Sequence, residues 1–354
     1  MQNKWIYSQK LNYLCQRWAG VFVWDATKRR RLRKWLQSIY EQEQKKKLAL
    51  LIHKQYTDSY CFFSRDGLGD VYFLASLMQS FKKEHPGKVI FFTAKKSLVP
   101  LLTSFSAIDE VVCKPELNFL QSGQVLQRPV QKGTLNRLFF PYRGTKKTYT
   151  FADNYAHLLG VPADASRQVP VLSSDNFKRA AAEFERLQLD PARTVILSPE
   201  ATMFDYRVLD SYFWLQLAQK IKQRGFQVVF NSRDKAYQQE KNSFLPVMDL
   251  AAFTSKVQHI IAFRSGLLDL LAGLGLTNFS AIYPANLEVI WAEESEFARL
   301  NQNHSKLHDS EFENIFHIYS LNSNFGRKDI QEYVYQNEPD VLEAALLSRL
   351  EGRE

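Results

Sequence analysis

From residue 57 onward, short apolar runs alternate with longer stretches in which apolar residues recur every three or four positions. The short runs predict buried strands and the longer stretches predict helices. The predicted strands are Tyr60–Phe63, Val89–Thr93, Glu110–Cys113, Leu138–Phe140, Thr194–Leu197, Gln227–Asn231, His259–Phe263 and Phe279–Tyr283. The predicted helices are Asp70–Glu84, Ser97–Phe105, Phe151–Leu159, Asp210–Arg224, Lys235–Asn242 and Gly266–Leu274. This alternation is typical of parallel sheets with helices on both faces.

The alternating pattern occurs twice, which predicts an α/β protein with two Rossmann-like domains. The length of 354 residues also fits two domains. We place them at 55–165 and 166–320, with a linker rich in Pro, Ser and Asp at 161–176. Helical spacing over Asp329–Leu350 predicts C-terminal helices within 321–354. Ligands of such folds bind beyond the carboxyl ends of the strands, so the loops after the strands are the candidate sites.

The net charge of +9 is concentrated in residues 1–54, which hold 13 Lys and Arg against 3 Asp and Glu. Within this segment Leu32, Trp35, Leu36, Ile39 and Tyr40 form one helical stripe, so we expect a basic amphipathic helical extension. Such a helix fits an anionic membrane surface. It also fits an apolar stripe packed on the protein's own body, or an anionic partner protein. The sequence leaves these three interpretations open.

Composition excludes several classes of protein. No apolar run approaches the roughly 18–20 residues of a membrane-spanning helix, and no signal peptide is evident. The three cysteines are widely spaced, which argues against a disulfide framework and favours a cytoplasmic location. Residues 55–354 hold 33 basic and 34 acidic side chains, so we expect no nucleic-acid partner. No His or carboxylate cluster has metal-ligand spacing, so we expect no metal and no cofactor.

The loop Ser64–Val71 contains two glycines, Gly67 and Gly69, that allow a ligand to approach the backbone. Asp70 follows at the predicted start of a helix, where a carboxylate is stabilised and can act as a general base. Asp70 could equally be a helix cap.

Two further loops carry candidate donor-binding groups. Arg264, at a strand end, precedes a predicted helix start that offers backbone N–H groups to a diphosphate. Arg207, in the other loop, suits a phosphate or a surface salt bridge. The candidate donor-binding residues are Ser198, Glu200, Thr202, Arg264, Ser265, Gly266 and Asp269. The stretch 117–152 is basic and without acidic residues, and its Arg143 is a candidate for binding an acceptor or simply a solvated surface residue.

These loops, in this order, resemble the heptosyltransferase family of bacterial cell-surface glycosyltransferases over about residues 60–285. Gly69-Asp70-Val71 with the later Pro86 resembles the family's opening "GDV…P" unit, and Asp109–Val112 its "ID-x-V" strand. Phe263–Gly275 matches the family segment "NDSGPMHLAAALG", with Arg264 in place of the usual Asp and Asp269 in place of the usual His. Arg207 stands where a Lys is usual.

The resemblance implies a GT-B fold, with the two domains facing each other across a cleft. It also implies that Asp70 deprotonates an acceptor hydroxyl. From the glycine loop and the basic stretch we expect Gly67, Gly69 and Arg143 to bind the acceptor. Arg207 and the start of the helix at Gly266 would bind the donor diphosphate in a metal-independent, inverting transfer. Because Arg264 departs from the family pattern, we expect a different donor sugar.

The expected function is therefore a glycosyltransferase at the inner face of the plasma membrane. It would move a sugar from a nucleotide-sugar to a glycan or lipid-linked acceptor of lipopolysaccharide or capsule. A nucleotide-sugar epimerase of the same fold, or a non-catalytic nucleotide-sugar-binding scaffold subunit, are the alternatives.

Overall fold

The computed structural model describes Ile39, Lys47 and residues 50–52, 54–56, 59–64, 67–114, 124–126, 136–137, 150–201, 209–284, 319–335 and 338–351. Two compact units make up the chain. The first comprises Met1–Arg65, Gly87–Lys95 and Val112–Leu138, and the second comprises Asp66–Pro86, Lys96–Val111 and Phe139–Glu354. The domain boundaries expected from the sequence remain a prediction.

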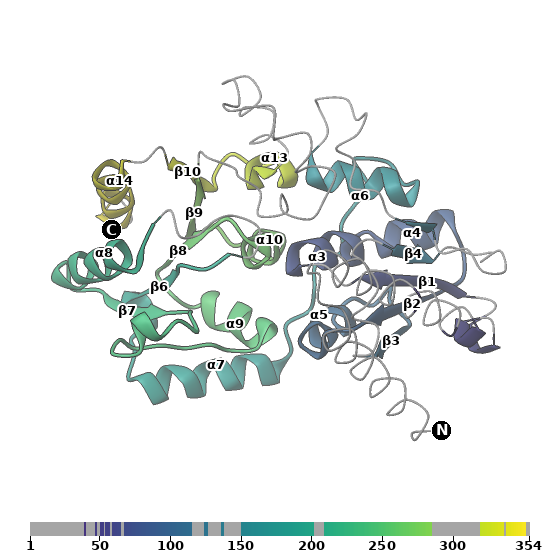
Figure 1. Ribbon diagram of the computed structural model, residues 1–354, viewed down its shortest axis with the longest axis horizontal. Helices are drawn as coiled ribbons and strands as arrows, with labels where there is room; N and C mark the ends of the chain where they lie inside the picture. The colour runs from purple at the N-terminus through teal and green to yellow at the C-terminus, as the bar shows by residue number, and fades with distance from the viewer. Residues whose placement is uncertain are drawn as a thin grey trace, which may run out of the picture. The chain divides into compact units, whose positions relative to one another are not determined.

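The first sheet has the strand order β3-β2-β1-β4-β5 (Figure 1). Its strands are β1 (Ser59–Ser64), β2 (Lys88–Thr93), β3 (Glu110–Cys113), β4 (Gln124–Leu126) and β5 (Asn136–Arg137). β1 pairs with β2 in parallel, but β4 pairs with β1 antiparallel, so the expectation of a wholly parallel sheet is wrong here. Beneath β1 and β2, the buried side chains of Ile52, Cys61, Ile90, Phe92 and Ala94 form one apolar cluster.

Helices of the second unit follow the strands of the first sheet along the chain. They are α3 (Leu68–Ser76), α4 (Met78–Glu84), α5 (Val99–Thr103) and α6 (Phe151–Leu159). α6 begins where predicted because Thr150 and Asp153 form a reciprocal capping pair. The single helix expected over Asp70–Glu84 is instead two helices that meet at Leu77.

The second sheet is parallel throughout, in the order β10-β9-β8-β6-β7. Its strands are β6 (Thr194–Ser198), β7 (Gln227–Phe230), β8 (His259–Phe263), β9 (Phe279–Pro284) and β10 (Gln331–Tyr335). The helices around it are α7 (Ser174–Leu187), α8 (Ser211–Gln223), α9 (Val247–Thr254), α10 (Gly266–Gly273), α13 (Leu321–Phe325) and α14 (Pro339–Glu351).

Large apolar side chains join this sheet to its helices. On one side, Trp214 of α8 and Leu346 of α14 lie in a buried cluster with Leu197 and Phe263 of the strands. α7 and α9 lie side by side (Figure 1), and the rings of Phe184 and Phe253 stack between them with centroids 4.2 Å apart. The carboxyl ends of β6 and β8 are thereby held at one edge, where the candidate loops begin.

Several local predictions are wrong. The expected helix Lys235–Asn242 is only a short 3₁₀ turn at Lys235–Tyr237, capped by Asp234. Ile330, Tyr333 and Val334 do not lie on a C-terminal helix: β10 occupies this stretch and pairs in parallel with β9, while α14 follows separately. α7 and α9 were not predicted.

Other predictions fall outside the described residues. The expected strand Leu138–Phe140 and almost all of the basic extension at 1–54 belong to this group. In the part of the chain that is described, no helix combines the length and apolar character needed to span a membrane.

Candidate functional site

Asp70 lies in the first turn of α3 with both carboxylate oxygens engaged. The backbone N–H of Gly67 donates to Oδ2 at 3.1 Å, and the hydroxyl of Tyr155 donates to Oδ1 at 2.8 Å. The hydrogen bond from Gly67 caps the helix, and a helix cap was one of the two roles expected for Asp70, the other being a general base. The bond from Tyr155, on α6, is a tertiary contact that fixes the direction of the carboxylate.

Sequence reasoning missed Tyr155, because a tyrosine on an amphipathic helix is indistinguishable from a core residue. Its ring stacks on that of Phe73, with centroids 6.3 Å apart and planes inclined by 10°. Phe151 also packs edge-on against Tyr155 at 5.2 Å. Asp70 is therefore oriented by a side chain whose own position is fixed by aromatic packing.

The starts of α3 and α10 touch at two glycines. A β-carbon on Gly69 would collide with the carboxylate of Asp269, and one on Gly266 would collide with the backbone nitrogen of Gly69. Only residues without a side chain allow this approach. The contact brings the predicted catalytic residue Asp70 and the predicted donor-binding Gly266 into one neighbourhood within the second unit.

Arg264 and Asp269 form a buried ion pair. Arg264 Nη2 donates to Asp269 Oδ1 at 2.6 Å and Nη1 donates to Oδ2 at 2.9 Å, and the two side chains are 4% and 3% exposed. Arg264 also donates to the backbone carbonyls of Ser265 and Tyr319, at 2.8 and 3.0 Å. Burial raises the pKa of Asp269 against the attraction of Arg264. Burial also acts to lower the pKa of Arg264, but the attraction of Asp269 prevails and raises it.

The pair changes the electrostatics expected at this loop. Arg264 and Asp269 both depart from the family pattern, and each was expected to face the nucleotide-sugar donor. In the structure they instead form hydrogen bonds with each other. The positive charge expected from Arg264 beside a diphosphate is balanced by Asp269, and a ligand would have to open the pair to reach either side chain. Their donor-binding roles remain predictions.

Ser265 is the N-cap residue of α10, with an extended backbone and no hydrogen bond from its side chain to the helix. The backbone N–H of Leu268 donates to the Ser265 carbonyl at 3.0 Å, so the loop is already folded as a helix start. The hydroxyl of Ser265 and the first N–H groups of α10 are the groups at this end that suit an anion.

A second polar cluster lies at the ends of β6 and β7. Ser198 is buried and its hydroxyl accepts a hydrogen bond from Asn231 Nδ2 at 3.0 Å, while the hydroxyl of Ser232 donates to Glu200 Oε1. Each of the two predicted residues thus has its own hydrogen-bond partner, Asn231 for Ser198 and Ser232 for Glu200. Sequence reasoning did not single out either partner. Three predicted site residues, Thr202, Arg207 and Arg143, lie outside the described residues.

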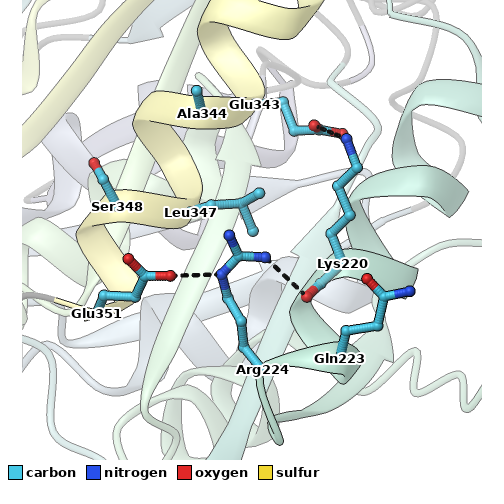
Figure 2. Close-up of a pocket in the computed structure, with 8 residues that line it drawn as sticks. All are labelled: Lys220, Gln223, Arg224, Glu343, Ala344, Leu347, Ser348 and Glu351. Carbon is cyan, nitrogen blue, oxygen red and sulfur yellow. Dashed lines mark hydrogen bonds and ion pairs between the residues drawn. The ribbon is translucent and has the colours of Figure 1, made fainter.

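A surface hollow between α8 and α14 contains none of the predicted site residues (Figure 2). Arg224 Nε donates to Glu351 at 2.7 Å, and Lys220 pairs with Glu343. Because these charges pair across the hollow, they serve to attach α14 to α8. We place the candidate site at the starts of α3 and α10 instead.

Comparison with known proteins identifies the fold. No protein-family profile matches the sequence, and no curated protein matches it. Among solved structures, ADP-heptose LPS heptosyltransferase II of Escherichia coli superposes with a TM-score of 0.52 at 12% identity, over 83% of this chain and 98% of that one. In fold, this chain is similar to a heptosyltransferase.

Two further structures are less similar. A family 9 glycosyltransferase of Veillonella parvula gives a TM-score of 0.49 at 16% identity, over 65% of this chain and 81% of that one. The E. coli heptosyltransferase WaaC, solved with ADP-2-deoxy-2-fluoro heptose, gives 0.45 at 10% identity, over 84% and 100%. The fold conclusion rests on the likeness to heptosyltransferase II, and the expected α/β fold of GT-B type is confirmed.

No group of three or more His, Cys, Asp or Glu side chains within the described ranges has the arrangement of a metal site. The groups that the structure offers to a ligand at the starts of α3 and α10 are a carboxylate, a serine hydroxyl and backbone N–H donors. Such a set suits an acceptor hydroxyl and an anionic donor.

Proposed function

We propose that this protein is a glycosyltransferase that moves a sugar from a nucleoside-diphosphate donor to a hydroxyl of a glycan or lipid-linked acceptor. The observation that carries the proposal is the oriented carboxylate of Asp70 beside the start of α10, in a chain with a heptosyltransferase fold. The E. coli neighbour is named an ADP-heptose LPS heptosyltransferase. For this chain we propose an acceptor in bacterial cell-surface polysaccharide, either lipopolysaccharide or capsule.

In the proposed reaction Asp70 takes the proton of the acceptor hydroxyl as its oxygen forms a bond to the anomeric carbon of the sugar. The bond between that carbon and the diphosphate oxygen breaks from the opposite side, so the configuration inverts and a nucleoside diphosphate leaves. Its charge would be neutralised by Arg207 and by the start of α10, with Ser265 and Gly266 as direct contacts. We propose that these groups act without a metal ion.

The ion pair of Arg264 with Asp269 supports a donor other than heptose. In the family pattern, an Asp and a His stand at these two positions. Here both charges are buried against each other, so neither is presented to a sugar in the way the family residues would be. We propose that the pair fixes the start of α10, since Arg264 also holds the carbonyls of Ser265 and Tyr319.

The first test is a thermal-shift series on the purified chain with nucleoside diphosphates and nucleotide-sugars, with and without EDTA. A ligand at 100 times its dissociation constant adds about 2.7 kcal/mol of stability. We expect one nucleotide class to stabilise the protein and EDTA to leave the shift unchanged. No response at millimolar concentration would contradict the transferase proposal.

Variants then test the role of Asp70. Asp70→Asn should lower kcat for sugar transfer by about 10²–10⁴-fold while nucleotide binding is retained, because only the proton acceptor is lost. Tyr155→Phe keeps the ring packed on Phe73 and removes only the hydrogen bond to Asp70. Its kcat should therefore lie between that of the wild type and that of Asp70→Asn. Transfer by Asp70→Asn at the wild-type rate would show that Asp70 is a helix cap alone.

We further propose that residues 1–54 hold the enzyme at the inner face of the plasma membrane, where a lipid-linked acceptor lies. Replacing Arg29, Arg30, Arg31 and Arg33 by Gln should abolish co-sedimentation of the full chain with anionic vesicles and leave nucleotide binding intact. Equal sedimentation of the variant and the wild type would contradict the membrane role.

The pairing of Arg264 with Asp269 also favours one second candidate, a nucleotide-sugar-binding subunit without catalysis. Such a subunit would give the same thermal shift. It would differ in showing no transfer with any acceptor fraction and no effect of Asp70→Asn.

A further inference from the structure

Arg167 lies between α6 and α7 in a segment with a fixed backbone. The Ser166 carbonyl accepts a hydrogen bond from the Ser80 hydroxyl at 2.9 Å, and the backbone N–H of Gln168 donates to the Ser76 carbonyl at 2.7 Å. Both neighbours of Arg167 are thus attached to α3 and α4. The starting point of its side chain is therefore determined by the fold.

The guanidinium group of Arg167 lies over two aromatic rings. Its central carbon is 4.8 Å from the ring centroid of Phe325, on α13, and 5.8 Å from that of Phe73, on α3. Cations are attracted to the faces of aromatic rings at such distances. The two rings hold the planar group in place before any ligand arrives.

One nitrogen of this guanidinium group is buried without a hydrogen-bond acceptor among the described residues. Its Nη1 atom is buried and, within the described part of the chain, has no hydrogen-bond partner, and no ion pair of Arg167 is found there. Burial lowers the pKa of Arg167 against the attraction of Tyr72, Asp153 and Asp269. A guanidinium group has five donors, and buried polar groups of native proteins are nearly always paired. Arg167 is half-buried, and its buried Nη1 atom departs from this pattern.

A short chain of contacts connects Arg167 with the candidate base. Phe73, beneath the guanidinium group, is one helical turn after Asp70 on α3, so the two side chains share a face. The same Phe73 ring stacks on Tyr155, which holds Asp70 Oδ1. The guanidinium group with the unpaired Nη1 atom thus belongs to the same packed group of side chains as the proposed proton acceptor.

We propose that Arg167 binds an anionic group of a reactant, a phosphate or a carboxylate. The planar fork of a guanidinium group matches both anions with two parallel hydrogen bonds. The inference rests on the proposed function for the identity of the reactants. The anion is either the diphosphate of the donor or a phosphate or carboxylate of the acceptor, and the two sources share one chemistry.

The experiment compares the wild-type chain with Arg167→Gln, Arg167→Lys and a matched control, Lys256→Gln. Lys256 also lies over a phenylalanine ring, Phe177, at 5.6 Å, so the control removes a comparable cation from a ring. Dissociation constants for inorganic pyrophosphate are measured by calorimetry, and KM is measured separately for donor and acceptor. A melting curve of each variant reports its stability.

We expect Arg167→Gln to weaken binding of its anion about 10-fold or more, Arg167→Lys to restore part of it, and Lys256→Gln to leave it unchanged. Weaker pyrophosphate binding with a higher donor KM assigns the donor diphosphate. Unchanged pyrophosphate binding with a higher acceptor KM assigns the acceptor.

A lower melting temperature of Arg167→Gln with unchanged binding and unchanged KM values would overturn the inference, because Arg167 would then be structural. Failure of the proposed function has a different signature. In that case the wild type transfers no sugar, and the inference is decided by pyrophosphate binding alone. Weaker binding by Arg167→Gln than by the wild type supports it, and equal binding contradicts it. If the wild type neither transfers sugar nor binds pyrophosphate, both are overturned.

Discussion

Replacing Asp269 by Asn should destabilise the protein strongly through Arg264. The two side chains are 3% and 4% exposed and share two hydrogen bonds, at 2.6 and 2.9 Å. Asparagine has nearly the same shape, so little packing is lost. What changes is that the buried guanidinium group loses its directly bonded counter-charge. It keeps the amide oxygen and two backbone carbonyls as acceptors, and only the attraction of Glu332 remains.

Removing one partner of a buried pair typically costs about 3–5 kcal/mol. Because the carbonyls of Ser265 and Tyr319 still accept from Arg264, we expect the lower end, about 3 kcal/mol. That is a large part of the roughly 5–15 kcal/mol by which native proteins are stable. At roughly 2–4 °C per kcal/mol for a cooperative unit of 150–250 residues, the melting temperature should fall by about 6–12 °C.

Asp249→Asn is the matched control. The Asp249 side chain is also buried, at 5% exposure, and pairs with Arg179, but the Arg179 side chain is 55% exposed. When the pair is broken, the exposed Arg179 is solvated by water, so we expect a clearly smaller loss of stability than for Asp269→Asn. Urea unfolding, followed by two independent probes, measures both variants.

The reasoning would be refuted if Asp269→Asn lost no more stability than Asp249→Asn. A double variant supplies a second check. Arg264→Met with Asp269→Leu leaves no buried charge, so it should be more stable than Asp269→Asn although it alters more atoms.

Two further predictions concern packing and pH. Gly266→Ala places a methyl group against the backbone nitrogen of Gly69, which cannot move aside, and should cost about 1–3 kcal/mol in a thermal melt. Gly67→Ala, whose β-carbon would meet only the Asp70 carboxylate at 3.3 Å, should cost less, and an equal loss would contradict the close contact. Two hydrogen bonds from Arg186 lower the pKa of Glu183, although burial of the carboxylate acts to raise it. The ionised Glu183 therefore stabilises the fold above the unfolded-state pKa of about 4.3. This stabilisation is lost as the pH falls through the lowered pKa of the folded state. The stability difference between wild type and Glu183→Gln should therefore shrink between pH 5 and pH 3, and a constant difference would contradict this assignment.

Some strands were predictable from the sequence. β8, which is buried on both faces, and β3, which is only partly buried, both have the predicted bounds, because a run of apolar, β-branched residues between polar loops leaves few other arrangements. α6 was equally predictable, since both its capping residues and its stripe are local features. Local signals of this kind also placed Asp70 and Ser265 at helix starts.

The C-terminal stretch shows where periodicity fails. Ile330, Tyr333 and Val334 have helical spacing, yet Tyr333 and Val334 lie in β10 at the edge of the second sheet, and Ile330 directly precedes it. A short apolar run fits either structure. The choice was made by β9, whose free edge offers backbone hydrogen bonds that only a strand can accept.

The candidate site divides in the same way. The sequence by itself determined which residues start α3 and α10 and which loops follow the strands, because caps, glycines and apolar spacing act over a few residues. Only the tertiary structure decided that Arg264 pairs with Asp269, that Tyr155 holds Asp70, and that Arg167 lies over Phe73 and Phe325. None of these contacts follows from local spacing, because each depends on which side chains the folded chain buries together. Burial favours pairing of the charged and polar groups of Arg264, Asp269, Asp70 and Tyr155, and aromatic packing positions Arg167.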